Sequence, residues 1–123
     1  MNIPENLRYS KTHIWADFTS DTVSIGLTDF AQHSMKSIVF VTLPEEGDMV
    51  TAGESLGQVE SVKTVSEIIS PVTGRVSRIN ERALDEPESI NTDPYGVWLV
   101  EVEEVTDREE LMDAAAFAAY CGE

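Results

Sequence analysis

The centre of the chain carries the stretch Glu60-Ser61-Val62-Lys63-Thr64-Val65-Ser66-Glu67. Lys63 is one of only three lysines in an acidic chain, and β-branched residues flank it inside a run of strand-like composition. A lysine that only kept a surface hydrated would not need this setting. The stretch predicts a β-hairpin that displays Lys63 at its tip, with Val62 or Val65 turned toward the core. An enzyme could acylate the amine there and attach a mobile cofactor.

Short β-rich runs separated by turn residues continue on both sides of this hairpin. Glycine and proline stand where a strand must stop or turn. This density of short strands indicates a mainly β protein, a small sandwich or barrel. We expect strands near His13–Trp15 and over Thr22–Leu27, Ser37–Leu43, Met49–Val50, Ser55–Ser61, Val65–Ile69, Gly74–Ile79 and Val97–Val105.

Two segments carry helical signals. Thr28 precedes Asp29–Gln32 as an N-cap, which predicts a short internal helix. Near the carboxy terminus, Thr106 and Glu109 form the pattern of a capping box, and Asp113 could cap a second short helix. Apolar residues recur there at helical spacing, so we expect a terminal helical segment packed on the β core.

Length and composition limit the class of protein. The 123 residues fit one domain, over 1–123, with its own core. A formal net charge of −15 argues against binding to nucleic acid or to an anionic membrane surface. The sequence has no apolar run of membrane-spanning length, no signal-peptide pattern near Met1 and a single cysteine. We therefore expect a monomeric cytoplasmic protein.

The chain lacks the residue patterns of an independent enzyme. Its two histidines, His13 and His33, have no second group of metal ligands beside them, and no glycine-rich phosphate loop or Gly-x-Ser-x-Gly element is present. We interpret His13, close to Trp15, as a packed and hydrogen-bonded structural residue. The acidic run Asp85–Glu88 is interpreted as a solvated loop. No catalytic residue and no metal site are expected.

Six blocks across nearly the whole chain resemble, in order, those of the H-protein family of the glycine cleavage system, in the lipoyl-domain superfamily. The blocks are Tyr9–Trp15, Ile25–Gln32, Ile38–Pro44, Val59–Lys63, Ser70–Gly74 and Asp93–Trp98. The resemblance implies a flattened hybrid of β-barrel and sandwich, with lipoate in amide linkage on Lys63. Glu60 and Gly74 keep the family's offsets from the lysine, which implies that they help the lipoylating enzyme recognise the hairpin.

The same resemblance implies a non-catalytic carrier that moves an aminomethyl group derived from glycine. Its partners would be a PLP-dependent glycine decarboxylase, a tetrahydrofolate-dependent aminomethyltransferase and a flavin-dependent dihydrolipoyl dehydrogenase. Biotin carriers share the architecture, but they usually place methionines beside the lysine, where this chain has Val62 and Thr64. An ordinary, unmodified hairpin lysine is the remaining alternative.

One departure from the family concerns the charge of the implied cleft. The loaded arm of H proteins folds into a surface cleft, where an acid can pair with the cationic amine. Ile14 replaces the usual glutamate of the first block, and the cleft residues implied here are Ile14, Ser34 and Glu67. Glu67 could partly replace the missing acid. The departure keeps a second hypothesis open, a related lipoate-binding protein that serves a heterodisulfide-reductase-like complex in sulfur oxidation.

Overall fold

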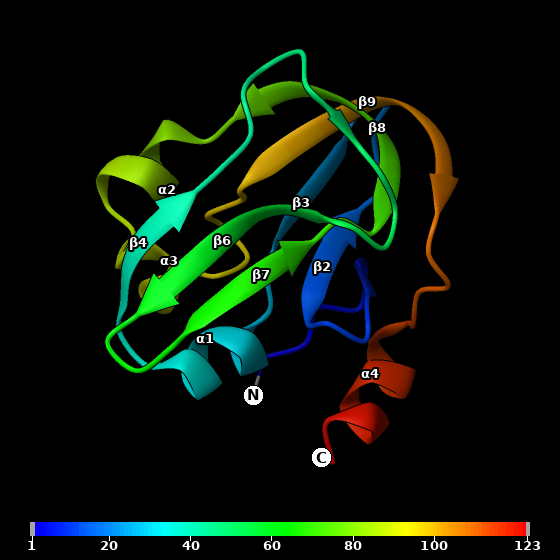
Figure 1. The fold of residues 1–123 in the computed structure, drawn as a ribbon. Coiled ribbons are helices and arrows are strands. Elements are labelled where there is room, and N and C mark those ends of the chain that lie inside the picture. The colour runs from blue at the N-terminus through cyan, green and yellow to red at the C-terminus, as the bar shows by residue number, and fades with distance from the viewer. Residues whose placement is uncertain (1, 123) are drawn as a thin grey trace.

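The computed structural model describes residues 2–122, which fold into two antiparallel sheets (Figure 1). The larger sheet has the order β1-β2-β3-β9-β8-β5 and contains β1 (Arg8–Tyr9), β2 (Ile14–Asp17), β3 (Val23–Leu27), β5 (Met49–Val50), β8 (Val72–Ile79) and β9 (Val100–Arg108). The smaller sheet has the order β4-β6-β7 and contains β4 (Ile38–Thr42), β6 (Ser55–Ser61) and β7 (Val65–Ile69). The strands predicted from the sequence are confirmed, with shifted ends.

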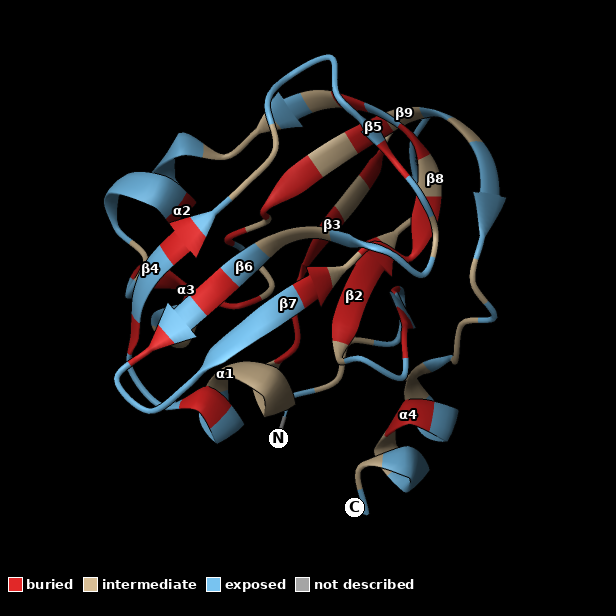
Figure 2. Cartoon of the chain, viewed as in Figure 1, coloured by how far each residue is buried: buried red, intermediate tan, exposed pale blue. Residues whose placement is uncertain are grey.

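One core of aliphatic side chains lies between the two sheets. Ile25, Val76 and Val102 of the larger sheet are buried in it, together with Val59 and Ile68 of the smaller sheet. Alternate side chains along a strand point to opposite faces, and the red segments in Figure 2 mark the buried stretches. Both sheets keep free edges in the described part of the chain. The mainly β fold is therefore confirmed as an open sandwich, and the barrel does not close.

The described residues form four helices, which are α1 (Asp29–Met35), α2 (Glu81–Asp85), α3 (Ser89–Thr92) and α4 (Ala114–Tyr120). The hydroxyl of Thr28 accepts a hydrogen bond from the main-chain N–H of Ala31 at 3.1 Å, so the predicted capped helix is confirmed. The acidic run was expected to be a loop, but Asp85 ends α2 and only residues 86–88 connect α2 to α3. No helix in residues 2–122 is both long and apolar enough to cross a membrane.

The end of β9 overturns one prediction about the tail. Thr106 was expected to cap a helix, but it lies inside β9, next to Asp107, which pairs with Thr73 of β8. Pairing with a neighbouring strand satisfies the backbone groups and outweighs a local capping preference. The helix begins only after Asp113, whose Oδ1 accepts a hydrogen bond from the main-chain N–H of Ala116 at 2.8 Å. The second predicted cap is therefore confirmed.

Aromatic rings hold α4 against the amino-terminal strands. Tyr9 and Phe117 are buried, and their rings stack with centroids 4.7 Å apart. The hydroxyl of Tyr120 donates a hydrogen bond to the main-chain oxygen of Lys11 at 3.0 Å. These contacts fix the loop that leads into β2, and this loop carries His13.

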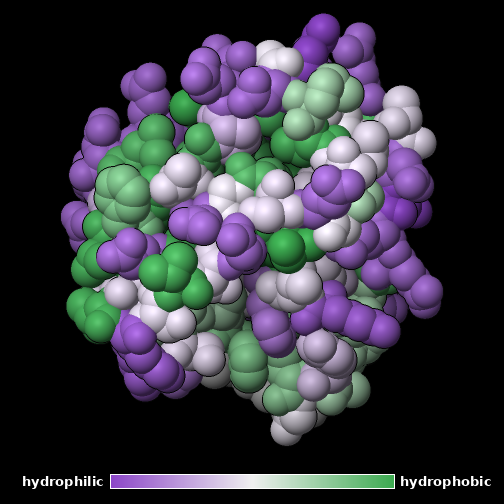
Figure 3. All heavy atoms as spheres, viewed as in Figure 1, coloured by the Kyte–Doolittle hydropathy of each residue, from purple (hydrophilic) through white to green (hydrophobic). Residues whose placement is uncertain are grey.

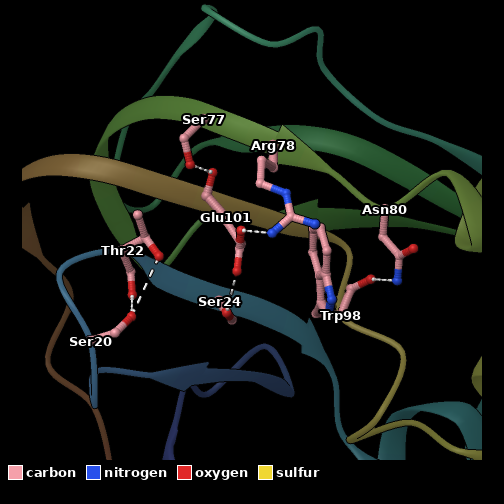
Figure 4. Close-up of polar contacts among 8 residues, drawn as sticks. All are labelled: Ser20, Thr22, Ser24, Ser77, Arg78, Asn80, Trp98 and Glu101. Atoms are coloured by element: carbon pink, nitrogen blue, oxygen red, sulfur yellow. Dashed lines mark hydrogen bonds and ion pairs between the residues drawn. The ribbon is translucent and has the colours of Figure 1, made fainter.

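Polar side chains cover the outer face of the larger sheet (Figure 4). Glu101 forms an ion pair with Arg78 at 3.2 Å and accepts a hydrogen bond from the Ser24 hydroxyl at 3.3 Å. The Arg78 guanidinium lies 5.1 Å from the centre of the Trp98 ring. The side-chain amide of Asn80 donates to the main-chain oxygen of Trp98 at 2.7 Å. Because these groups satisfy one another, this face offers no obvious binding chemistry.

Candidate functional site

A buried serine shapes the turn between β6 and β7. Ser61 is 6% exposed, and its Oγ accepts hydrogen bonds from the main-chain N–H groups of Lys63 at 3.2 Å and Thr64 at 3.1 Å. The N–H of Val62 donates to the carbonyl of Ser37, at 3.0 Å, which ties the tip to the start of β4. Lys63 is thus held at an exposed turn between antiparallel strands, as predicted. Sequence reasoning missed Ser61, although serine commonly forms such turns with the N–H groups that follow it.

The valines beside Lys63 do not face the core. Val62 is 69% exposed and Val65 is 53% exposed. Val65 pairs with Glu60, so both side chains lie on the outer face of the sheet. The inward positions of β6 belong to Val59 and Ser61, which are buried. The prediction that one valine turns inward is therefore wrong, because the strand register gives the inward positions to other residues.

The side chain of Lys63 extends toward α1. Its Nζ lies 3.3 Å from the main-chain oxygen of Ser34, in the last turn of that helix. Carbonyl groups at the carboxy-terminal end of a helix attract a positive charge. The contact is exposed to solvent, so it adds little to stability and leaves the amine accessible.

Ser34 also borders a cavity of about 180 Å³ between β2, α1 and β7. Ile14, Ser34 and Glu67, which were assigned to one cleft, all line this cavity. Sequence reasoning did not assign the other lining residues, which are Thr12, His13, Leu27, Phe30, Ala31, Met35, Val59 and Ser66. The spacing of Phe30, Ala31 and Ser34 along one helix face was a usable signal for part of the set.

The cavity has a mixed lining of polar and apolar side chains, and it is apolar on the side of Ile14, where the family carries an acid. Ile14, on β2, is 1% exposed, and it lies beside Leu27 and Phe30 in this lining. Such a lining suits a hydrocarbon chain better than a charged group. Any acid that faces this space must therefore come from another element of the fold.

Glu67 lies at the border of the cavity, but its carboxylate already has partners. It accepts hydrogen bonds from the Ser55 hydroxyl and, at 3.1 Å, from the side-chain amide of Gln58. These bonds, the one from Ser55 first, hold the pKa of Glu67 below its usual value. Glu67 is therefore an ionised acid held in place by two neighbours, which restricts how freely it can replace the missing glutamate.

His13 lies between α1 and α4. Its ring stacks on Phe30, with centroids 4.8 Å apart, and meets the edge of Phe117 at 5.6 Å. The prediction of a packed histidine is confirmed. Its buried Nδ1, however, has no hydrogen-bond partner among the described residues, so the predicted bond is missing at that atom. Burial lowers the pKa of His13 and favours the neutral ring.

The two residues assigned to recognition of the hairpin lie far apart in the fold. Glu60 is exposed on β6, three residues before Lys63. Gly74 lies in β8 of the other sheet, where it pairs with Val50. A Cβ atom at Gly74 would come within 2.6 Å of the main-chain oxygen of Glu103. Glu60 is thus exposed to solvent, whereas Gly74 is packed against the backbone of β9, and their part in recognition stays a prediction.

Two open sheets that present a lysine on a hairpin beside an apolar cavity define a carrier of the lipoyl type. Residues 7–123 match the family described as Glycine cleavage H-protein. The glycine cleavage system H protein of Lachnoclostridium phytofermentans is 46% identical over 121 residues, which are 98% of this chain and 95% of that protein. The corresponding protein of Bacillus cereus is 48% identical over 121 residues, 96% of this chain and 95% of its own length.

Comparison of the fold with solved structures indicates the same family. A crystal structure of a glycine cleavage system H protein from Mycobacterium marinum superposes with a TM-score of 0.95 at 42% identity and covers 98% of this chain and 100% of that one. This chain belongs to the glycine cleavage H-protein family. These relatives support the glycine cleavage interpretation and give no support to the sulfur-oxidation alternative.

Proposed function

We propose that Lys63 carries lipoate in amide linkage and that the protein serves glycine cleavage as a non-catalytic carrier. The observation that carries the proposal is the contact from Lys63 Nζ to the Ser34 carbonyl, 3.3 Å away. It places the amine of an exposed hairpin beside a residue that lines the apolar cavity. Attachment and shelter of a cofactor would then take place at adjacent points on the surface.

The residues present fit this group. Lys63 offers an accessible amine, and Ile14, Leu27 and Phe30 give the cavity an apolar lining that suits the hydrocarbon part of lipoate. When bound, lipoate supplies a disulfide that accepts electrons and a carbon fragment. The protein itself positions the lysine through the hydrogen bonds of Ser61. Acylation also removes the charge that Lys63 presents to the end of α1.

The partners follow from the family. A lipoylating enzyme would modify Lys63. A PLP-dependent glycine decarboxylase, an aminomethyltransferase and a dihydrolipoyl dehydrogenase would then use the attached group in turn. Tethering makes each encounter within a docked complex effectively intramolecular. The net charge of −15 would draw the carrier, as a cytoplasmic monomer, toward basic surfaces on these larger enzymes.

Within the site, Glu67 is the acid that remains near the cavity, because Ile14 occupies the position of the usual glutamate. We propose that Glu67 gives weak electrostatic support to a cationic cargo while Ser55 and Gln58 hold its carboxylate. Thr12 and Ser34 add hydroxyl groups to the same lining. A mostly apolar cavity with one engaged acid should protect such a cargo less well than a cavity with a free carboxylate.

Intact-mass analysis followed by peptide mapping tests the assignment. Protein produced together with a lipoylating system should gain one lipoyl group, located on the peptide that contains Lys63. Addition of biotin would contradict the proposal. So would a lipoyl group on Lys11 or Lys36, or an unmodified chain.

A further inference from the structure

Four large apolar side chains are exposed around one acid on the outer face of the smaller sheet. Glu60 pairs with Phe40 of β4 on one side and with Val65 of β7 on the other. Phe40 is 59% exposed, Val39 beside it is 47% exposed, and Val62 follows Glu60 by two residues. We call this set, Val39, Phe40, Glu60, Val62 and Val65, the Phe40 face. Figure 3 shows apolar side chains gathered over β4 and the nearby end of the β6–β7 hairpin.

Exposed large apolar side chains are concentrated on the Phe40 face. Seven large apolar side chains are markedly exposed in the described chain, and four of them belong to this face. Surface apolar residues that occur singly need no explanation, but a contiguous group marks a site of interaction. The hairpin also ends at β7, an edge strand with a free side in the described structure. A partner that covers this face would bury apolar area next to Lys63.

The charge at the centre of the face indicates the chemistry of that partner. The side chain of Glu60 has no ion pair or hydrogen bond among the described residues, whereas Arg75 and Arg78 are paired with acids on the other sheet. Enclosing an unpaired carboxylate among apolar groups is unfavourable unless a cation meets it. The partner should therefore present an apolar recess that contains an arginine or a lysine. A net charge of −15 on the carrier assists the approach of such a surface.

We propose that the Phe40 face is the docking surface for the enzyme that attaches lipoate. The inference rests on the proposed function of Lys63. Acyl transfer takes place at Nζ, one side-chain length from the turn, so the modifying enzyme must contact the surface around that turn. Enzymes that use the finished cofactor act at the far end of a long arm, and their docking need not include this face.

The chemical step is an acyl substitution without oxidation or reduction. An activated lipoyl donor, such as an acyl adenylate, provides the carbonyl carbon. The ammonium of Lys63 first loses a proton to give the neutral amine. Nζ then forms the amide bond to this carbon and gives up a second proton to the enzyme, while the bond from the carbon to the activating group breaks and that group, AMP in the case of an acyl adenylate, leaves with the bonding electrons. The Phe40 face contributes binding and orientation and takes no part in the bond changes.

The test measures docking separately from transfer. A lipoate–protein ligase, supplied with lipoate and ATP, is assayed with wild-type carrier and with Phe40→Ser, Phe40→Leu, Glu60→Gln and Met49→Ser. Phe40→Ser should raise KM for the carrier about tenfold with little change in kcat, the size of effect expected for loss of an aromatic anchor. Phe40→Leu keeps an apolar side chain and should retain most of the affinity. Met49, 68% exposed on β5 of the other sheet, is the matched control and should leave KM unchanged.

A second measurement uses carriers that also contain Lys63→Arg, so that binding occurs without transfer. Phe40→Ser should raise the Kd for the ligase by a similar factor, and Glu60→Gln should weaken the dependence of Kd on salt. Because Phe40 is exposed, its replacement should leave the unfolding temperature unchanged, which shows that the fold is retained.

The outcomes separate this proposal from the function that underlies it. If the wild type accepts lipoate on Lys63 and Phe40→Ser has an unchanged KM and Kd, the docking surface is refuted and the carrier function remains. If Phe40→Ser is lipoylated normally but supports slower glycine decarboxylation, the face belongs to a later partner and the proposal is wrong. A dimer that dissociates in Phe40→Ser would assign the face to a second copy and would also refute it. A wild type that accepts no lipoate overturns both proposals.

Discussion

The outer faces of the two sheets differ in how their side chains are satisfied. On the larger sheet, Glu101 is bound by Arg78 and Ser24, and the exposed Arg75 is paired with Glu103 and Glu104. On the smaller sheet, Glu60 stands between Phe40 and Val65 with no such partner among the described residues. Both faces belong to antiparallel strands. The contrast shows that the fold alone does not determine which surface is free to bind.

The same contrast separates residues that hold the fold from residues that meet partners. Gly74 and the Arg78 network belong to the larger sheet and act within the chain. Glu60 and Phe40 face outward from the smaller sheet, and Lys63 lies exposed at the tip of its β6–β7 hairpin. A substitution on the larger sheet should therefore change stability first, and one on the smaller sheet should change recognition or modification first.

The largest expected effect is the loss of lipoylation when Lys63, on the hairpin of the smaller sheet, is replaced. Lys63→Arg should abolish lipoyl addition completely, because arginine keeps the positive charge but cannot form the lipoyl amide. Intact mass after coexpression with a lipoylating system measures this loss. Lys36→Arg is the matched control and should still gain one lipoyl group. If Lys63→Arg still gained a lipoyl group, the lipoylating enzyme would be modifying a lysine outside this hairpin, and the assignment of Lys63 would be wrong.

Next in size is the effect of filling a glycine position in the larger sheet. Gly74→Ala should lower the free energy of unfolding by about 1–3 kcal/mol, because its Cβ would overlap the Glu103 carbonyl and the Val102 side chain. Chemical denaturation measures the loss. Lipoylation per folded molecule should stay normal, whereas Glu60→Gln should show the opposite pattern. A stable Gly74→Ala protein that cannot be lipoylated would show that Gly74 acts in recognition and not in packing.

A smaller effect is expected when Ile14, which lines the cavity between the two sheets, is replaced by glutamate. Ile14→Glu should lengthen the lifetime of the methylamine-loaded form about fivefold, which corresponds to roughly 1 kcal/mol for a partly screened ion pair. The unloaded variant should be less stable than wild type, because Ile14 is buried and the new carboxylate would lack a partner. Release kinetics of the loaded protein and denaturation of the unloaded protein provide the two readings.

Ile14→Gln is the matched control for this change, since it has the same length as glutamate without the charge. Its loaded form should decay at nearly the wild-type rate. Equal lifetimes for the two variants would mean that the size of the side chain, and not its charge, protects the cargo. A lipoylated wild type that a competent glycine decarboxylase cannot load would contradict the proposed role in glycine cleavage.

The smallest expected effect concerns pH and the loop before β2. Burial lowers the pKa of His13 from 6.5, so the unfolded chain takes up this proton before the folded protein does. The neutral His13 ring therefore makes its full contribution to the free energy of unfolding above about pH 6.5. This contribution is lost as the pH falls toward the lower pKa that His13 has in the folded protein. Between about pH 7.5 and about pH 5.5, the free energy of unfolding should fall less in His13→Gln than in wild type. The exposed His33→Gln serves as the control, and an identical fall in His13→Gln would refute the assignment.

The elements that sequence predicted well depend on neighbouring residues. Thr28 and Asp113 cap helices through bonds to residues three positions ahead, which the sequence displays directly. The elements that it missed depend on distant pairing. Thr106 has the local pattern of a cap, but pairing with β8 extends β9 beyond it. The exposure of Val65 likewise follows from its partner strand, which short-range alternation cannot specify.

The sequence by itself determined the mainly β class, the lysine hairpin and the family, because turn residues, alternation and motif spacing are properties of short segments. Only the tertiary structure decided that Leu27, Val59 and Ser66 line the same cavity as Ile14, Ser34 and Glu67, since they come from β3, β6 and β7. It also decided that Phe40 faces solvent, because an irregularity after Ile38 shifts the register of β4 against β6. Side-chain direction in a sheet depends on pairing between distant strands, and that pairing exists only in the folded chain.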